Sequence, residues 1–147
     1  TLHRCAIALH QHLDAAFARI WTLDSLGEYL ILQASAGLYT HLDGKHSRIK
    51  VGQFKIGWIA QQRQAHLTND VITDPLISDR AWAQREGMVA FAGHPLLIKN
   101  RLLGVVAIFA RHPLTAQTSK ELASTSTAIS VGIDRKLAAQ ALRQNAE

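Results

Sequence analysis

The segment from residue 86 to residue 110 constrains the fold of this chain more than any other. It reads EGMVAFAGHPLLIKNRLLGVVAIFA, so two apolar runs flank the polar residues Lys99, Asn100 and Arg101. Runs rich in Val, Ile, Leu and Phe on both sides of a short polar reversal predict a β-hairpin. Residues 102–110 carry no charged side chain, which is typical of a strand covered on both faces. We therefore predict a central sheet organised around this hairpin.

Length and composition favour a single globular domain over residues 1–147. The hydrophobic fraction of 48% is ordinary for a chain that buries a real core. The longest uncharged apolar run, residues 102–110, is about half as long as a membrane-spanning helix needs to be. The N-terminus lacks the pattern of a signal peptide, and the single cysteine, Cys5, cannot form an internal disulfide. We expect a cytoplasmic domain that makes no membrane contact.

The formal charge of +5 raises the question of nucleic-acid binding. The 16 Lys and Arg residues are spread along the chain, with a mild concentration only between Lys45 and Lys55. Binding to nucleic acid usually requires a dense basic patch on one face of the protein. We expect no nucleic-acid partner, and a patch around residues 45–55 stays open as the alternative.

Strands and helices are also predicted before and after the hairpin. Apolar residues at helical spacing predict a helix over residues 2–13, and alternating residues predict strands over 14–24 and 29–34. Residues 48–51 predict a short edge strand. Residues 52–87 read as a partly helical crossing segment, with a helix after Gly57, an extended piece at 66–70 and a helix at 81–85 that Ser78 or Asp79 caps and Gly87 ends. Such a crossing can cover one face of the sheet and close a cavity.

A long amphipathic helix is predicted after Pro113. It continues towards the last residue, so residues from about 134 to 147 are interpreted as the start of a helical linker to an output module. Its apolar stripe and that of the first helix are suited to pairing with the same surfaces of a second chain, as in a homodimer. The predicted interface residues are Leu2, Leu9, Ile129, Ile133 and Leu137.

The order and spacing of several short motifs resemble the GAF family of sensory domains. The resemblance covers nearly the whole chain and is carried by residues 14–24, Gly57-Trp58-Ile59-Ala60, Thr68-Asn69-Asp70, Glu86-Gly87-Met88, Phe91-Ala92, Pro95-Leu96 and Leu103-Gly104-Val105-Val106. It implies an α+β fold, an α/β sandwich. In that fold the N- and C-terminal helices lie on one face of a central antiparallel sheet, and a small-molecule pocket lies on the other face beneath the crossing segment.

The resemblance also implies a role in signal transduction. Residues 134–143 look like the linkers that lead into bacterial kinase modules, so we expect a sensory or signal-transmitting domain of a two-component sensor histidine kinase. The alternative is a ligand-free dimerisation or interaction module, for example of a transcription regulator. No hydrolase elbow, phosphate loop or phosphoacceptor-histidine motif is visible, so we expect no catalysis by this domain. Kinase activity would belong to other parts of the full-length protein.

Comparison with known subclasses of the family limits which cofactors this domain is expected to bind. Bilin-binding members attach the chromophore through a pocket cysteine, and residues 74–94 contain none, so a covalent bilin is not expected. The polar set of many cyclic-nucleotide-binding members is not recognisable, and the methionine-sulfoxide reductases of this fold use several cysteines. Haem and cyclic nucleotides stay open as ligands, although no motif in the sequence supports either. His41 and His46 lack acidic or thiol partners at suitable spacing, so no metal site is expected.

An apolar pocket with a few polar anchors is the default form of a ligand site. The candidate ligand-binding residues are Trp58, Asp70, Trp82, Phe91 and His94, with Arg19 contributed by the first strand. Each also has a purely structural reading, because large aromatic residues commonly pack in cores and aspartates commonly form turns. Strand alternation places Phe91 on the opposite face from His94, so both cannot point into one pocket.

Overall fold

A six-stranded antiparallel sheet with the strand order β3-β2-β1-β6-β5-β4 forms the centre of the molecule. The computed structural model describes residues 1–146. The strands are β1 (Phe17–Leu23), β2 (Tyr29–Gly37), β3 (Arg48–Lys50), β4 (His66–Thr68), β5 (Ala90–Ile98) and β6 (Arg101–Ala110). The helices are α1 (Leu2–His12), α2 (Phe54–Gln62), the 3-10 turn η1 (Val71–Thr73), α3 (Arg80–Glu86) and α4 (Ala116–Ala146). This is the predicted α+β fold.

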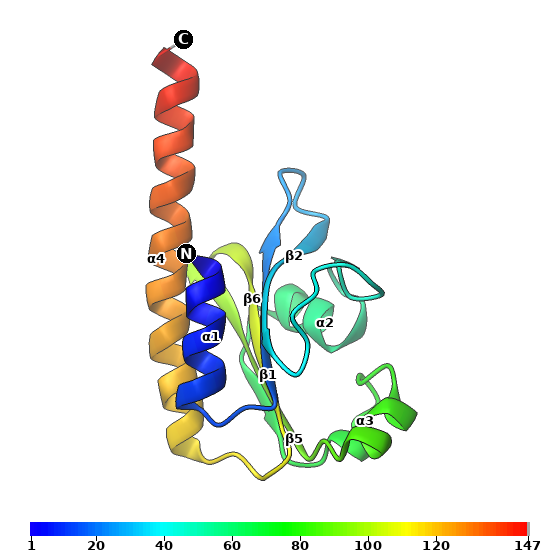
Figure 1. Ribbon diagram of the computed structural model, residues 1–147. Coiled ribbons are helices and arrows are strands. Elements are labelled where there is room, and N and C mark those ends of the chain that lie inside the picture. The colour runs from blue at the N-terminus through cyan, green and yellow to red at the C-terminus, as the bar shows by residue number, and fades with distance from the viewer. Residues whose placement is uncertain (147) are drawn as a thin grey trace.

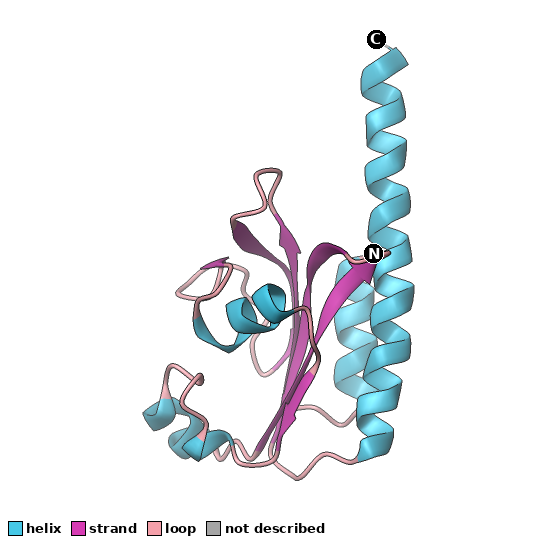
Figure 2. Ribbon diagram, turned by 180° about the vertical axis from the view of Figure 1, so that it is seen from behind, coloured by secondary structure: helices cyan, strands magenta, loops and turns pink. Residues whose placement is uncertain are grey.

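Helices cover both faces of the sheet. The terminal helices α1 and α4 lie side by side on one face, which we call the helix face (Figure 1). The crossing segment with α2 and α3 lies over the opposite face, which we call the cavity face (Figure 2). The predicted division between terminal helices and crossing segment is therefore confirmed.

The hairpin of β5 and β6 has the tight turn that its sequence predicts. Lys99 and Asn100 join the strands with φ angles of +48° and +67°. Two successive left-handed residues make a turn whose twist matches that of the paired strands. Arg101 already pairs with Ile98, so the turn is one residue shorter than predicted. Every residue of β6 is buried except Arg101 and Phe109, which confirms a strand covered on both faces.

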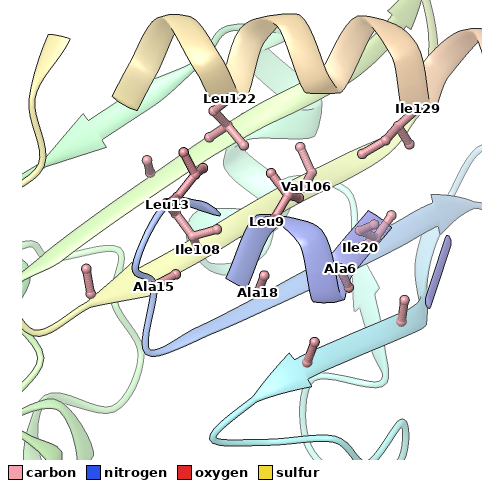
Figure 3. Packing of buried hydrophobic residues seen from close by; sticks show 14 of the residues in the cluster. Ala6, Leu9, Leu13, Ala15, Ala18, Ile20, Val106, Ile108, Leu122 and Ile129 are labelled. Carbon is pink, nitrogen blue, oxygen red and sulfur yellow. The ribbon is translucent and has the colours of Figure 1, made fainter. Parts of the chain in front are cut away.

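Alternation along β1 divides the hydrophobic core into two clusters. Ala18 and Ile20 face the terminal helices, whereas Phe17 and Trp21 face the crossing segment. Figure 3 shows the helix-face cluster, in which residues of α1 and α4 pack on β1 and β6; it includes Ala6, Leu9, Leu13, Leu122, Ile129, Val106 and Ile108. The same strand thus contacts the terminal helices on one side and the crossing segment on the other.

Local boundaries differ from the predictions where tertiary contacts decide them. The α2 helix begins at Phe54 and contains Gly57, although the sequence predicted a helix after that glycine. A Cβ atom on Gly57 would lie 2.5 Å from the carbonyl oxygen of Lys50, so the glycine permits close packing of α2 on the end of β3. The caps of α3 are as predicted, because the Asp79 side chain accepts a hydrogen bond from the Trp82 amide and Gly87 ends the helix with φ of +69°.

Part of the predicted dimer stripe on the terminal helices packs against the sheet of the same chain. The side chains of Leu9 and Ile129 are only 3% and 4% exposed because they pack against the sheet. The sheet of the same chain therefore covers these two residues, and their contact with a second chain stays a prediction. Leu2 and Ile133 pack partly against the same cluster, and Leu137 is 46% exposed. In the described residues 1–146, no helix combines the length and the apolar character that a membrane span requires.

Candidate functional site

A cavity of about 310 Å³ lies on the cavity face, between the sheet and the crossing segment. The sheet supplies its floor through Phe17, Arg19, Trp21, Phe91 and Phe109. The crossing segment supplies its cover through Phe54, Lys55, Ile56, residues 76–79 and Trp82, and the β2–β3 connection closes one side with Tyr39, His41, Lys45 and His46. The position is the one expected for a ligand pocket in this architecture.

Aromatic rings pack together in one wall of the cavity, where α3 and the β2–β3 connection meet the sheet. Phe17 stacks on Phe109 with ring centroids 5.1 Å apart, and it meets Tyr39 edge to face at the same distance. Trp82 of α3 meets Phe109 at 5.2 Å, and its Nε1 donates a hydrogen bond of 2.6 Å to the Tyr39 hydroxyl. These contacts fix α3 and the β2–β3 connection against the sheet. The result is a wall of rigid, mainly apolar surface.

Arg19 is the charged group in the floor of the cavity. It lies between Phe17 and Trp21 on β1, and strand alternation turns all three side chains to the cavity face. The residue is 7% exposed, and its Nε donates a hydrogen bond of 2.9 Å to the Ser35 hydroxyl. Its Nη2 lies 3.4 Å from both the ring Nε2 and the carbonyl oxygen of His41. Burial lowers the pKa of Arg19, which the nearby Tyr39 partly opposes.

An ion pair anchors the cover of the cavity. Lys55 Nζ of α2 lies 2.5 Å from Asp74 Oδ2, and the two side chains are 5% and 9% exposed. The other carboxylate oxygen accepts a hydrogen bond of 2.9 Å from the Leu76 amide. The pair therefore ties α2 to the loop whose residues 76–79 cover the cavity.

Three titratable groups near the cavity, Asp74, His66 and His46, have pKa values shifted by burial and by neighbouring groups. Burial raises the pKa of the Asp74 carboxyl, but the hydrogen bonds from Lys55 and Leu76 outweigh burial and lower its pKa overall. Burial and the charge of Lys55 lower the pKa of His66, which Asp74 opposes. Burial, followed by the charges of Arg19 and Lys45, lowers the pKa of His46. The last shift therefore reflects burial first and the positive charge at this side of the cavity second.

The structure brings three of the six predicted ligand-binding residues to the cavity. Arg19, Trp82 and Phe91 line it. Trp58 lies outside the lining and meets the His66 ring edge to face at 5.5 Å. Asp70 is exposed, and His94 lies at a β5 position paired with Val106 of the helix-face cluster. Ligand contact by Arg19, Trp82 and Phe91 stays a prediction.

The sequence reasoning did not identify several lining residues, among them Phe17, Trp21, Tyr39, His46 and Lys55. Phe17 and Trp21 had a usable signal, because alternation along the first strand places them on the same face as Arg19. Tyr39, His46 and Lys55 lie in the β2–β3 connection and in α2, where no periodic pattern indicates which side chain reaches the sheet.

The other candidate binding features of the described chain are a more polar hollow, a single cysteine and possible metal ligands. A hollow of about 480 Å³ lies between α1 and α4, and its lining includes the polar residues His12, Lys120 and Glu121. Cys5 of α1 packs partly against the helix-face cluster, away from the cavity lining. Within residues 1–146, no group of three or more His, Cys, Asp or Glu side chains is arranged to hold a metal ion.

Solved structures show where this architecture occurs. The GAF domain of a phosphoenolpyruvate-protein phosphotransferase from Coxiella burnetii is 22% identical, with a TM-score of 0.83 over 95% of this chain and 84% of that one. A domain of a protein described as a two-component sensor histidine kinase from Sinorhizobium meliloti 1021 is 20% identical, with a TM-score of 0.71 over 97% and 94%. Residues 122–287 of a methyl-accepting chemotaxis protein are 22% identical, with a TM-score of 0.71 over 91% and 87%. No curated protein matches the chain in sequence.

The sheet, the terminal helices on one face and the cavity on the other define a sensory or regulatory type of domain. The GAF domain family matches residues 1–133, and the chain belongs to that family. The sequence resemblance is thereby confirmed.

Proposed function

We propose that this domain binds a small molecule in the cavity of the cavity face and passes the effect of binding to α4. The cavity itself carries the proposal, because rigid aromatic walls and a buried arginine enclose about 310 Å³ on the face opposite the terminal helices. Neighbouring residues of β1 contact the cavity and the helices in turn. A ligand that prefers one position of β1 would therefore shift the population of helix arrangements.

The proposed setting is a cytoplasmic two-component sensor histidine kinase of a bacterium, in which this domain performs no catalysis. α4 extends well past the rest of the domain, whereas the family match ends at residue 133 (Figure 1). A helix that leaves its domain in this way suits a linker from residue 134 onward to an output module. The likeness to the Sinorhizobium domain supports the same setting at the level of fold.

A homodimer through the projecting part of α4 is the second element of the proposal. Leu137 continues the stripe of Ile129 and Ile133 beyond the point where the sheet covers it, and it is 46% exposed. Two parallel copies of α4 would cover this residue at an interface of the coiled-coil type. The ligand-free interaction module remains the alternative, and it would use the same helix with an empty cavity.

The ligand-binding proposal predicts that filling the cavity abolishes binding without unfolding the domain. Ile77 is partly buried and lines the cavity from the loop of the cover, so the larger ring of Ile77→Trp would occupy the space. The measurement is a ligand-observed NMR screen of a metabolite mixture, together with native mass spectrometry of the purified chain. At least one compound should bind the unmodified chain and not Ile77→Trp.

Ile72→Trp is the matched control for this experiment. Ile72 lies in the same crossing segment and is also partly buried, but it does not line the cavity. The control should retain the bound compound. Absence of any bound molecule on the unmodified chain would favour the ligand-free interaction module.

The dimer proposal predicts that Leu137→Asp converts a dimer into a monomer by placing charges opposite each other along the helix pair. Light scattering coupled to size-exclusion chromatography measures the mass. Leu26→Asp is the control, since Leu26 is 79% exposed in the β1–β2 turn and its replacement should leave the dimer intact. A dimer mass that survives Leu137→Asp would contradict the assignment.

A further inference from the structure

We propose that the cavity takes a small organic monocarboxylate with an aromatic body, and that the guanidinium of Arg19 binds its carboxylate. This inference rests on the proposed small-molecule function and specifies the chemical class of the ligand. It begins from Arg19, a permanently charged side chain that is 7% exposed in a mainly aromatic floor.

The charge of Arg19 is only partly compensated by the protein. Phe17 and Tyr39 each lie with a ring centroid 5.8 Å from the guanidinium carbon, and the Ser35 hydroxyl accepts from Nε. No carboxylate of residues 1–146 forms an ion pair with Arg19. Burying a charge without an opposite charge beside it costs free energy, and an apolar side chain at the same position would avoid that cost. A ligand anion would supply the missing partner.

The guanidinium also has an open edge. Nη1 makes no hydrogen bond within the described residues, and the two contacts of Nη2 to His41 are both at the long distance of 3.4 Å. Among those residues, no fully buried side-chain nitrogen or oxygen lacks a partner, so Nη1 must retain contact with open space. Nη1 and Nη2 together present the two parallel donors that a carboxylate accepts.

The surrounding charges favour a monoanion. Lys55 is already neutralised by Asp74, and the exposed Lys45 lies at the rim with its Nζ 5.8 Å from the Phe54 ring centroid. Asp79 also lines the cavity, where its carboxylate caps α3. A phosphate monoester with two charges would meet the repulsion of Asp79 without a second unpaired cation in the floor. One carboxylate balances Arg19.

Size and surface define the rest of the ligand. A volume of about 310 Å³ corresponds to roughly ten water molecules at their share of the liquid, so it suits a ligand of about ten non-hydrogen atoms. The rings of Phe17, Trp82 and Phe109 provide apolar faces and edges at which an aromatic ring can pack. Phenylacetate has the required charge, ring and size, and it serves as the probe.

The test compares phenylacetate with its neutral isostere phenylacetamide by isothermal titration calorimetry on the 147-residue chain. Phenylacetate is expected to bind at least about tenfold more tightly, because only the carboxylate compensates Arg19. Its addition should shift the Nε–Hε resonance of Arg19 in the NMR spectrum. Arg19→Met, which keeps an unbranched side chain but removes the guanidinium and its charge, should lose the preference for phenylacetate and at least about tenfold in phenylacetate affinity.

Arg48→Met is the matched control, because Arg48 is an exposed arginine of the edge strand β3 outside the cavity lining. It should retain full phenylacetate affinity. Where Arg19→Met does not fold, Arg19→Lys tests the paired contact instead: it keeps the charge, but a single ammonium group cannot offer two parallel donors, so phenylacetate affinity should fall. The two isosteres on the unmodified chain test the charge preference without any substitution.

Equal binding of phenylacetate and phenylacetamide would overturn the carboxylate assignment and leave the small-molecule function standing. Tighter binding of phenyl phosphate than of phenylacetate would overturn it in favour of a phosphate ligand. If neither isostere binds at millimolar concentration, the assignment also fails. In that case the cavity-filling experiment with Ile77→Trp decides separately whether the proposed function survives.

Discussion

Asp74→Asn is expected to reduce the free energy of unfolding by about 3–5 kcal/mol, the usual cost of leaving one member of a buried ion pair without its partner. Lys55 and Asp74 are 5% and 9% exposed, so solvent cannot replace the lost carboxylate charge. Urea denaturation followed by circular dichroism measures the change. The loss should be concentrated in the cover of the cavity, since the pair joins α2 to the loop after η1.

Two further variants separate the charge effect from simple loss of contacts. The double substitution Lys55→Met with Asp74→Leu removes both charges and should cost clearly less than Asp74→Asn alone. Asp134→Asn breaks the exposed pair with Arg101, whose side chains are 37% and 58% exposed, and should change stability by no more than about 1 kcal/mol. Equal effects of Asp74→Asn and Asp134→Asn would show that the buried pair contributes no more to stability than an exposed pair.

The same variant should also alter the response to acid. The folded-state pKa of Asp74 lies below its ordinary value, so its contribution is complete above the unfolded pKa of about 3.9 and is lost as pH falls through the folded pKa. His66 also has a lowered pKa, so protonation below about pH 6.5 disfavours the folded state. Asp74→Asn should remove the loss of stability in the lower window, which a pH series of urea titrations would show.

Local patterns were sufficient to predict most of the fold. The hairpin of β5 and β6, the buried character of β6 and the caps of α3 all follow from residues close in sequence. The start of α2 does not, because it depends on how closely Gly57 approaches β3. A backbone contact between distant segments leaves no periodic signal in either of them.

The candidate site could be predicted only where it lies on regular structure. Arg19 and Phe91 were accessible to reasoning because alternation assigns strand residues to a face. Lys55 and Tyr39 reach the cavity through the tertiary placement of α2 and the β2–β3 connection, which no local pattern specifies. The partner of the apolar stripe of α4 could not be predicted either, since the sequence of an apolar helix face is the same whether a sheet or a second chain covers it.

Ile129 offers the sharpest test of this last distinction. Ile129→Asp is expected to reduce the free energy of unfolding by more than about 4 kcal/mol, because it removes buried apolar contacts and places a carboxylate in an apolar cluster. The nearby hydroxyls cannot compensate, since Ser126 donates to the Leu122 carbonyl and Ser130 donates to the Ser126 carbonyl. The far-ultraviolet circular dichroism spectrum should show an unfolded chain, or urea denaturation a greatly weakened one.

Two controls link this result to the packing of α4. Ile129→Val keeps an apolar side chain and should cost only about 0.5–1.5 kcal/mol. Leu142→Asp places the same carboxylate on the same helix at a residue that is 71% exposed, so the domain should stay folded with a change within about 0.5 kcal/mol. A folded Ile129→Asp protein whose only change is dissociation of a dimer would support the predicted place of Ile129 in the dimer interface. That outcome would mean that a partner chain, and not the sheet, supplies the packing on which this part of α4 depends.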